Sequence, residues 1–410
     1  MPALQAGLES SYINPDSQHS RMRLHFSNLK IPTPAIGIAT LLTMCSVLAA
    51  GLLPFEMPRN DVAWVSQENA VHFGRHGTIL SRGILSAITG YGTAITMEVW
   101  LRPSRIWTTG CVLTFYGYSS TRQFRVEQDY ADLVLQVGEP DKNTADLHRT
   151  LRVTNVFRNK QFVLTVTSND RETMVYVNGE LAARSAAFRI SSIDMTGRLI
   201  LANCPHRNHS WSGDMKGLAI FEIAITPPQI LNDYQSWVKR GEPSSQLADK
   251  LVALYLFHEH VGNIIHDTAP AGVALEIPRQ FVVIDQLRFE SPITEFRTQR
   301  TYVENVLLNI AGFVPLGLML ALYFGAVWKI KRATLTAVIV GATISFAIEL
   351  LQSFTPTRYS GCTDLVTNTL GTWIGTFLYG SLRSFGFLKV EAPIVSQSAL
   401  CQANPEKVEL

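Results

Sequence analysis

Four apolar segments, each close to the length of a membrane-spanning helix, constrain the fold of this 410-residue chain most strongly. They are nearly free of charge and run from Ala35 to Leu53, from Val306 to Trp328, from Ala333 to Leu351 and from Leu365 to Leu382. A helix needs roughly 20 apolar residues to cross a bilayer. The stretch between the first and second segments has an ordinary soluble composition. The sequence therefore predicts a membrane protein with one large water-exposed insert.

The Lys and Arg residues beside these segments predict the orientation, because short flanks rich in them stay in the cytoplasm. Three such clusters flank the spans: Arg21, Arg23 and Lys30; Lys329, Lys331 and Arg332; and Arg383 and Lys389. All three fall on one side if the spans alternate in direction. We expect a multi-pass protein of a bacterial inner (cytoplasmic) membrane, with both termini cytoplasmic and the insert outside. The net charge of +2, without a basic patch interleaved with aromatics, gives no indication of nucleic-acid binding.

The first span has an alternative interpretation as a cleaved signal peptide, since Val47–Gly51 offers small residues to a peptidase. The tail of residues 1–34 is much longer than an ordinary n-region, so we favour an uncleaved helix.

The five cysteines do not form a disulfide framework. Cys45 lies in a span, Cys362 in the outer loop and Cys401 in the C-terminal tail, which leaves Cys111 and Cys204 in the insert. An oxidising compartment permits a bridge between that pair, but the sequence does not place their Cβ atoms. We expect two free buried thiols and, without CxxC or His/Cys spacing, no zinc site.

The insert has the pattern of an all-β domain. Short alternating or apolar runs recur between turn signals: Ala94–Trp100, Cys111–Tyr116, Phe162–Val166, Thr173–Val177, Arg198–Leu201 and Gly217–Ile225. Asn178-Gly179 lies between Met174–Val177 and Glu180–Ala183 and predicts a two-residue hairpin, since Asn-Gly readily adopts positive φ. Many short strands with regular turns indicate a β-sandwich.

Several motifs in the insert resemble the LamG-like, concanavalin A-like jelly roll. They are Ala94–Pro103, the hairpin Tyr176–Leu181, and Trp211–Gly217 with the following Phe221–Thr226 and Gln229–Leu231. The resemblance covers about Val71 to Trp237. One segment departs from the usual strand order of such domains. Leu251–Phe257, followed by Ile264–Asp267, resembles a strand that is usually near the start of the domain but here lies near its end. We expect either a permuted strand that closes the sheet or a short ancillary hairpin.

The resemblance does not identify a ligand, because relatives bind glycans, carry calcium on a loop edge, or serve as spacers. Trp100 and Trp107 could stack on sugar rings, although Trp100 sits in mid-strand and is expected in the core. Asp170, Asp194 and Asp214 form no recognisable calcium pattern and are expected to be polar loop residues.

Glu98 and Glu180 raise the idea of a glycosidase, since paired carboxylates perform that chemistry. No two acids of the insert show the close strand spacing that would support it. We assign no cofactor, metal ligand or catalytic residue to the chain, and calcium on the jelly roll stays an open alternative that no motif supports.

Seven polar residues gather near one end of the predicted helices: Asn305, Asn309, Glu349, Gln352, Arg358, Asp364 and Asn368. Glu349 ends an otherwise uncharged run, and a carboxylate there is costly unless something pairs with it. Within each pair of the same helix the spacing is three or four residues, so both members share a face. The expected topology puts all seven at the outer leaflet, beneath the jelly roll. Pro315, Gly317, Gly371 and Gly375 are expected to let helices pack closely.

This constellation resembles the VanZ-like family of bacterial membrane proteins. The matching pieces are Asn309–Gly317, Ser345 with Ile348–Gln352, Arg358, and Asp364–Gly371 with Gly375. The resemblance implies that the first span, with Leu53-Pro54-Phe55, is the family's opening helix and that the jelly roll is inserted after it. It also implies an outer-surface role near envelope glycopolymers, because the namesake is linked to glycopeptide antibiotic resistance.

We therefore expect a four-helix transmembrane VanZ-like bundle with an all-β jelly-roll sandwich inserted after its first helix. The expected parts are a cytoplasmic tail 1–34, a first helix 35–55, a jelly roll 59–245, an ancillary β segment and linker 246–302, a three-helix region 303–388 and a tail 389–410.

Two functional hypotheses follow. In the first, the protein is a non-enzymatic envelope protein whose jelly roll contacts a glycan or partner, while the helices hold a lipid head group or lipid-linked precursor. In the second, the cluster is catalytic, with Glu349 or Asp364 as general base and Arg358 holding a phosphate. A purely structural alternative pairs Glu349 with Arg358 and uses the amides to join helices.

Overall fold

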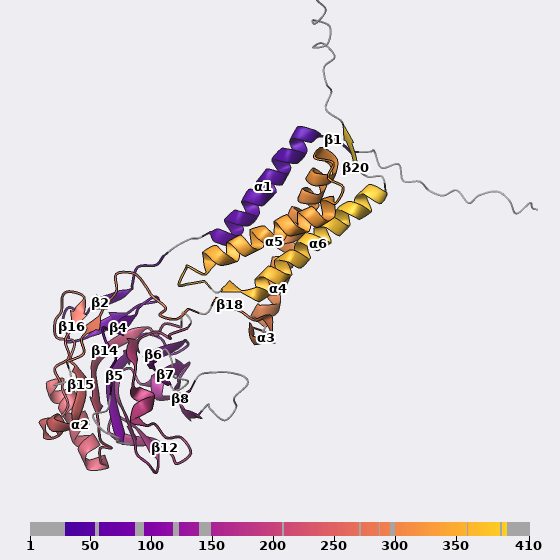
Figure 1. Ribbon diagram of the computed structural model, residues 1–410. Coiled ribbons are helices and arrows are strands. Elements are labelled where there is room, and N and C mark those ends of the chain that lie inside the picture. The colour runs from indigo at the N-terminus through magenta and orange to yellow at the C-terminus, as the bar shows by residue number, and fades with distance from the viewer. Residues whose placement is uncertain are drawn as a thin grey trace, which may run out of the picture.

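The structure is a computed structural model that consists of a helical region and a β-sandwich (Figure 1). It describes residues 29–53, 57–86, 94–117, 123–138, 149–206, 209–269, 272–286, 288–295, 300–358, 360–385 and 388–391. Arg21, Arg23, Pro54, Phe55 and Cys401 lie outside these residues, as do most of the two predicted tails.

All four predicted apolar segments are helical. The long helices are α1 (Thr33–Leu52), α4 (Arg300–Leu322) with the π-helical η4 (Tyr323–Val327), α5 (Ala333–Gln352) and α6 (Cys362–Ser384), and α3 (Pro292–Glu295) is a short turn. Within the described residues, three helices are long and apolar enough to cross a membrane: α1, α4 with η4, and α5. The chain is therefore a membrane protein with a β domain. Helix α6 is less apolar because Thr, Gly and Ser recur along it.

The β domain is a sandwich of two sheets. The first sheet has the order β12 (Glu180–Ser185), β11 (Thr173–Val177), β10 (Phe162–Ser168), β5 (Ile95–Pro103), β14 (Gly213–Phe221), β3 (Val71–Phe73) and β2 (Val62–Trp64), with β15 (Leu251–Tyr255) paired to β14. The second has the order β16 (Ile264–Ile265), β17 (Leu275–Glu276), β4 (Ile79–Ser81), β13 (Arg198–Leu201), β6 (Thr109–Tyr116), β7 (Phe124–Asp129), β8 (Asp132–Val137) and β9 (Arg149–Val153). The connections include η1 (Val156–Arg158), η2 (Ser192–Met195) and η3 (Ser245–Lys250). A continuous apolar core fills the space between the sheets.

Each predicted strand segment contains a strand, although β14 ends at Phe221 and not at Ile225, and the late segment proves to be a permuted strand. Asn178 and Gly179 have φ of 55° and 80° and join β11 to β12, as the hairpin signal predicts. Strand β15 pairs antiparallel with β14 in the first sheet, whereas β16 pairs with β17 in the second. Residues 246–302, which we expected to be ancillary, thus supply strands to both sheets.

Helix α2 (Pro227–Arg240) adds a third layer outside the first sheet (Figure 1). Alternate residues of β5 point to opposite faces, so Val99 lies in the main core while Trp100 and Glu98 face outward. Trp237 of α2 covers that outer face and contacts the Trp100 ring edge-on, with centroids 6.3 Å apart. The expectation that Trp100 belongs to the core is confirmed, since its exposed fraction is 8%.

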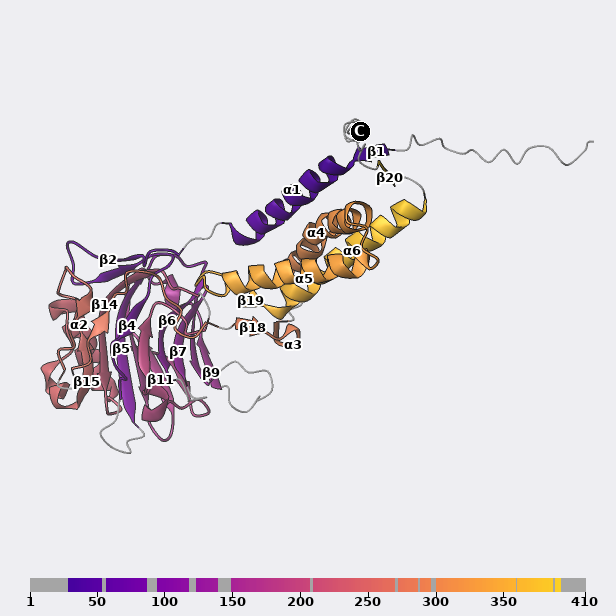
Figure 2. The ribbon, with the colours of Figure 1, turned by 45° about the horizontal axis from the view of Figure 1, so that its top comes forward.

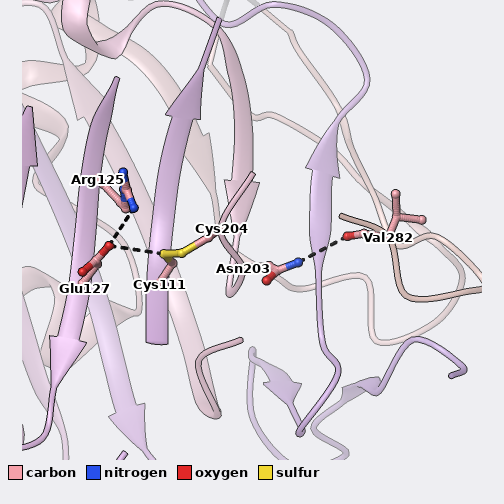
Figure 3. The surroundings of a disulfide bond; sticks show 6 residues. All are labelled: Cys111, Arg125, Glu127, Asn203, Cys204 and Val282. Atoms are coloured by element: carbon pink, nitrogen blue, oxygen red, sulfur yellow. Dashed lines mark hydrogen bonds and ion pairs between the residues drawn. A yellow bond between two sulfur atoms is a disulfide. The ribbon is translucent and has the colours of Figure 1, made fainter. Parts of the chain in front are cut away.

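The prediction of two free thiols in the insert is wrong, because Cys111 and Cys204 form a disulfide (Figure 3). Their Cα atoms lie 5.5 Å apart, within the range that a bridge requires. The backbone leaving β13 brings Cys204 to β6, where Ala202 N–H donates to the Val112 carbonyl. The two cysteines are 93 residues apart in sequence, so only the sheet pairing brings them together.

The sandwich is joined to one end of the helices by a short segment. Strand β18 (Arg288–Glu290) pairs in parallel with β19 (Ser360–Gly361), which belongs to the loop between α5 and α6. The Gln286 side-chain amide donates to the carbonyls of Thr355 and Arg358 at 3.0 and 2.7 Å. This loop is thereby fixed to the chain that leaves the sandwich.

The first and last strands of the chain, β1 (Leu29–Pro32) and β20 (Leu388–Glu391), lie at the opposite end of the helices and pair in parallel (Figure 2). Lys30 and Lys389 are register partners in this pair. These basic residues therefore lie far from the sandwich.

Candidate functional site

The candidate site is a cavity of about 590 Å³ among the four long helices. Its wall comprises Thr43, Ser46, Val47, Ala50 and Gly51 of α1; Leu308, Asn309, Gly312, Phe313 and Pro315 of α4; Ile348, Glu349 and Gln352 of α5; and Asp364 and Asn368 of α6. Five of the seven polar residues singled out in the sequence thus line one cavity. The volume is within the range of small-molecule sites.

The cavity amides tie the helices to one another. Asn309 Nδ2 donates to Asp364 Oδ1 at 2.8 Å and links α4 to α6. Gln352 Nε2 donates to the Gly51 carbonyl at 2.6 Å and links α5 to the end of α1. Each bond satisfies a polar group that would be costly among apolar helices.

Glu349 lies at the last turn of α5 and is 2% exposed. Its Oε2 accepts a hydrogen bond from Gly361 N–H at 3.1 Å. Gly361 belongs to β19, the strand that pairs with the segment leaving the sandwich. Glu349 therefore connects the cavity wall to the loop on which the sandwich is anchored.

Two of the seven polar residues lie outside the cavity wall. Arg358 Nη2 donates to the Leu53 carbonyl at 3.0 Å, which holds the α5–α6 loop against the end of α1. Asn305 is exposed on the first turns of α4. The structure thus separates the one cationic side chain of the predicted cluster from the lining.

The buried amide of Asn368 is only half satisfied. Its Nδ2 donates to Ser345 Oγ at 3.0 Å, and the residue is 5% exposed. Its Oδ1 has no hydrogen-bond partner in the described part of the chain. A buried acceptor without a partner costs free energy.

The predicted small residues bring α4 and α6 into backbone contact. A Cβ placed on Gly371 would lie 2.2 Å from the Ile310 carbonyl oxygen, and one on Gly375 would lie 2.1 Å from that of Val314. On α4, a Cβ on Gly317 would lie 2.0 Å from the Thr372 carbonyl oxygen. Pro315 is inside α4 and forms part of the cavity wall, where its missing N–H frees a carbonyl one turn earlier.

Sequence reasoning missed the wall that α1 supplies. Thr43 and Ser46 are three residues apart and therefore share a face of an otherwise apolar helix. Paired hydroxyls in a span are a weak signal that could have indicated a polar lining, but hydroxyl residues are also frequent where helices merely pack.

The acidic residues of the sandwich serve separate contacts. Asp214 accepts from Arg102 Nε at 2.6 Å and lies 2.6 Å from His72 Nδ1, whereas Asp194 caps η2. Asp170 is exposed in a turn. Among the described residues the one potential metal cluster is Cys111, Glu127 and Cys204, and its two sulfurs are joined in the disulfide.

Glu98 is fully enclosed beneath α2. Trp237 Nε1–H donates to its Oε2 at 2.7 Å and the Thr165 hydroxyl donates to its Oε1 at 3.2 Å. Burial, followed by the nearby Asp233 carboxylate, raises the pKa of Glu98 to about 8. Glu180 is exposed in β12. One of the two carboxylates is therefore enclosed and the other is exposed.

Comparison with known proteins gives two family matches. Residues 251–383 match the family model described as VanZ/LLP1, and residues 81–231 match the model described as the concanavalin A-like lectin/glucanases superfamily. Both confirm the resemblances found in the sequence. A search of curated proteins found no match.

Solved structures give low-scoring similarities. A structure titled for the dependence of botulinum neurotoxin type C cell entry on two ganglioside molecules is 12% identical with a TM-score of 0.32, covering 43% of this chain and 45% of that one. A proposed carbohydrate binding protein from Bacteroides ovatus is 14% identical with a TM-score of 0.35, covering 56% and 63%. The carbohydrate-binding module of a Ruminococcus gnavus IT-sialidase, bound to α2,3-sialyllactose, is 11% identical with a TM-score of 0.30, covering 43% and 97%. This chain spans less than two-thirds of the length of the first two.

Proposed function

We propose that this protein, which joins a VanZ-like membrane region to a concanavalin A-like sandwich, is a non-enzymatic cell-envelope protein. Its sandwich contacts an envelope glycan, and its membrane cavity holds a lipid head group or a lipid-linked precursor. The single observation that carries the second statement is the cavity of about 590 Å³ with two carboxylates and three amides in its wall.

The proposed orientation places the sandwich and the cavity outside the cytoplasm. Lys30 and Lys389 lie at the helix end remote from the sandwich, which favours a cytoplasmic location for that end. The Cys111–Cys204 disulfide supports an oxidising compartment for the sandwich. Helix α6 is the fourth span in this arrangement, and the face that carries its small residues packs against α4.

The lining favours a head group that donates hydrogen bonds. Glu349 and Asp364 contribute carboxylate oxygens to the wall, and Asn309, Gln352 and Asn368 contribute amides. Arg358 lies outside the wall and donates to Leu53. A hydroxyl or an ammonium group therefore fits this wall better than a bare phosphate does.

The test fills the cavity without disturbing helix packing. Gly312 lines the cavity, and a Cβ placed there meets nothing within 4 Å. Gly380 of α6 is equally open but lies outside the wall, so Gly380→Leu is a matched control for Gly312→Leu. Native mass spectrometry of the protein in nanodiscs should show a retained lipid in the wild type and in Gly380→Leu that Gly312→Leu loses. Equal retention in all three would refute cavity binding.

Catalysis on a lipid-linked substrate is the second candidate, and the presence of Glu349 and Asp364 in one wall favours it. Chemical conversion of the lipid distinguishes the catalytic function from the binding function. Envelope lipids incubated with the wild type should be recovered unchanged under the binding proposal. Conversion that is lost in both Glu349→Gln and Asp364→Asn would establish the enzyme instead.

A further inference from the structure

Two exposed aromatic side chains lie together at one end of the strands of the second sheet. Trp107, in the loop between β5 and β6, is 78% exposed, and Tyr130, in the turn between β7 and β8, is 53% exposed. Their ring centroids lie 6.4 Å apart with planes inclined at 60°. Large aromatic rings left in water at this level cost solvation free energy and indicate a contact surface.

The backbone that carries these rings is held rigidly. Gln128 is 1% exposed, and its Nε2 donates to the carbonyls of Arg105 and Tyr130 at 2.7 and 2.9 Å. Its Oε1 accepts from Trp211 Nε1–H at 2.8 Å, which anchors the amide in the core. Tyr130 N–H in turn donates to the Thr108 carbonyl at 2.9 Å. One buried amide thus fixes both the loop before Thr108 and the turn at Tyr130.

Charged groups flank the aromatic pair in the same turn. Asp129 and Asp132 are register partners on either side of Tyr130, and Arg152 of β9 forms ion pairs with both. The side chains of these three residues remain one-quarter to one-half exposed. Asp132 Oδ1 also accepts from Asn155 N–H at 3.0 Å. The surface therefore offers ring faces beside carboxylate and guanidinium groups.

We propose that Trp107 and Tyr130 form the glycan-contacting site of the sandwich, in which a pyranose ring stacks on the Trp107 indole. A pyranose has an apolar C–H face and hydroxyl groups at its rim, which match aromatic rings bordered by Asp129, Asp132 and Arg152. This inference rests on the proposed contact between the sandwich and an envelope glycan. A fixed loop lowers the ordering cost of binding, which gives Gln128 a positioning role.

The experiment measures binding of the full-length protein, solubilised in detergent, to immobilised bacterial polysaccharides and peptidoglycan sacculi. Trp107→Ala and Tyr130→Ala are compared with Val261→Ala, a matched control because Val261 is 75% exposed on the same domain. Trp107→Phe is included because a phenyl ring preserves stacking. Since both aromatics are largely exposed, thermal unfolding should stay unchanged in all variants.

We expect the wild type and Val261→Ala to bind one of these glycans, and Trp107→Ala to weaken that binding roughly tenfold or more. Tyr130→Ala should weaken it to a smaller extent, and Trp107→Phe should retain most of it. Binding that survives Trp107→Ala unchanged would overturn the site while leaving the glycan proposal intact. Failure of the wild type to bind any of these glycans would overturn both.

Discussion

Replacing Glu98 by Gln should remove a large pH dependence from the stability of the sandwich. Glu98 is buried beneath α2, where Trp237 Nε1–H and the Thr165 hydroxyl donate to its carboxyl oxygens. A glutamine has the same shape and keeps both contacts, because its oxygen can accept from Trp237 and its amide can donate to the Thr165 oxygen. The substitution therefore removes the titration and preserves the packing.

The sign follows from the pKa of Glu98, which burial raises from 4.5 to about 8 in the folded protein. Below pH 4.5 the group is protonated in the folded and unfolded states alike. Between pH 4.5 and 8 the folded state retains a proton that the unfolded state has released, so the free energy of unfolding falls as pH rises. The loss is complete above the folded pKa and amounts to roughly 5 kcal/mol at 1.36 kcal/mol per pKa unit.

Asp233 acts in the same direction at lower pH, since burial raises its pKa from 3.8 to about 6. Only the upper half of the Asp233 titration remains above pH 6, so stability changes between pH 6 and 8.5 report mainly on Glu98, whose contribution over that range is on the order of 3 kcal/mol.

Urea unfolding of the segment 57–285 at pH 6 and pH 8.5 measures this difference. The segment contains the whole core between the two sheets, so we expect it to fold without the helices. The wild type should lose about 3 kcal/mol between the two pH values, whereas Glu98→Gln should remain nearly constant. Glu180→Gln is the control, because Glu180 is an exposed glutamate of the same domain. Parallel pH profiles for the wild type and Glu98→Gln would refute the assignment of the titration to Glu98.

Three further predictions concern orientation, the disulfide and helix packing. A cysteine introduced at Ala182, in a background without other free thiols, should react with an impermeant thiol reagent in cells whose outer wall is opened. A cysteine introduced at Lys331 should not react. The reverse pattern would refute the proposed orientation. Replacing Cys111 and Cys204 together by Ala should lower the free energy of unfolding of the sandwich by about 2 to 5 kcal/mol in urea titrations. An unchanged urea midpoint would show that the disulfide does not constrain the unfolded chain. Gly375→Ala would place a Cβ 2.1 Å from a carbonyl oxygen of α4 and should lower the stability of the helical region by about 3 kcal/mol or more. The loss is measured as a lower thermal unfolding midpoint in detergent. An unchanged midpoint would mean that α4 and α6 can separate freely.

The sequence by itself determined the local elements of this protein. Apolar length predicted the four helices, because backbone hydrogen bonding within a helix depends on consecutive residues alone. The Asn178-Gly179 pair predicted its hairpin, since positive φ at two adjacent residues is a local property. The spacing of Glu349 and Gln352 on one helix and of Asp364 and Asn368 on the next predicted shared faces, and the structure brings all four to one wall.

The tertiary structure decided every feature that depends on which surfaces meet. Arg358 donates to the Leu53 carbonyl and is not part of the cavity wall, because the α5–α6 loop meets both the end of α1 and the chain that leaves the sandwich. The Cys111–Cys204 bridge required β13 to lie against β6, and the burial of Glu98 required α2 to cover the outer face of β5. Such contacts join residues far apart in sequence, and their free energies arise only when both surfaces are assembled.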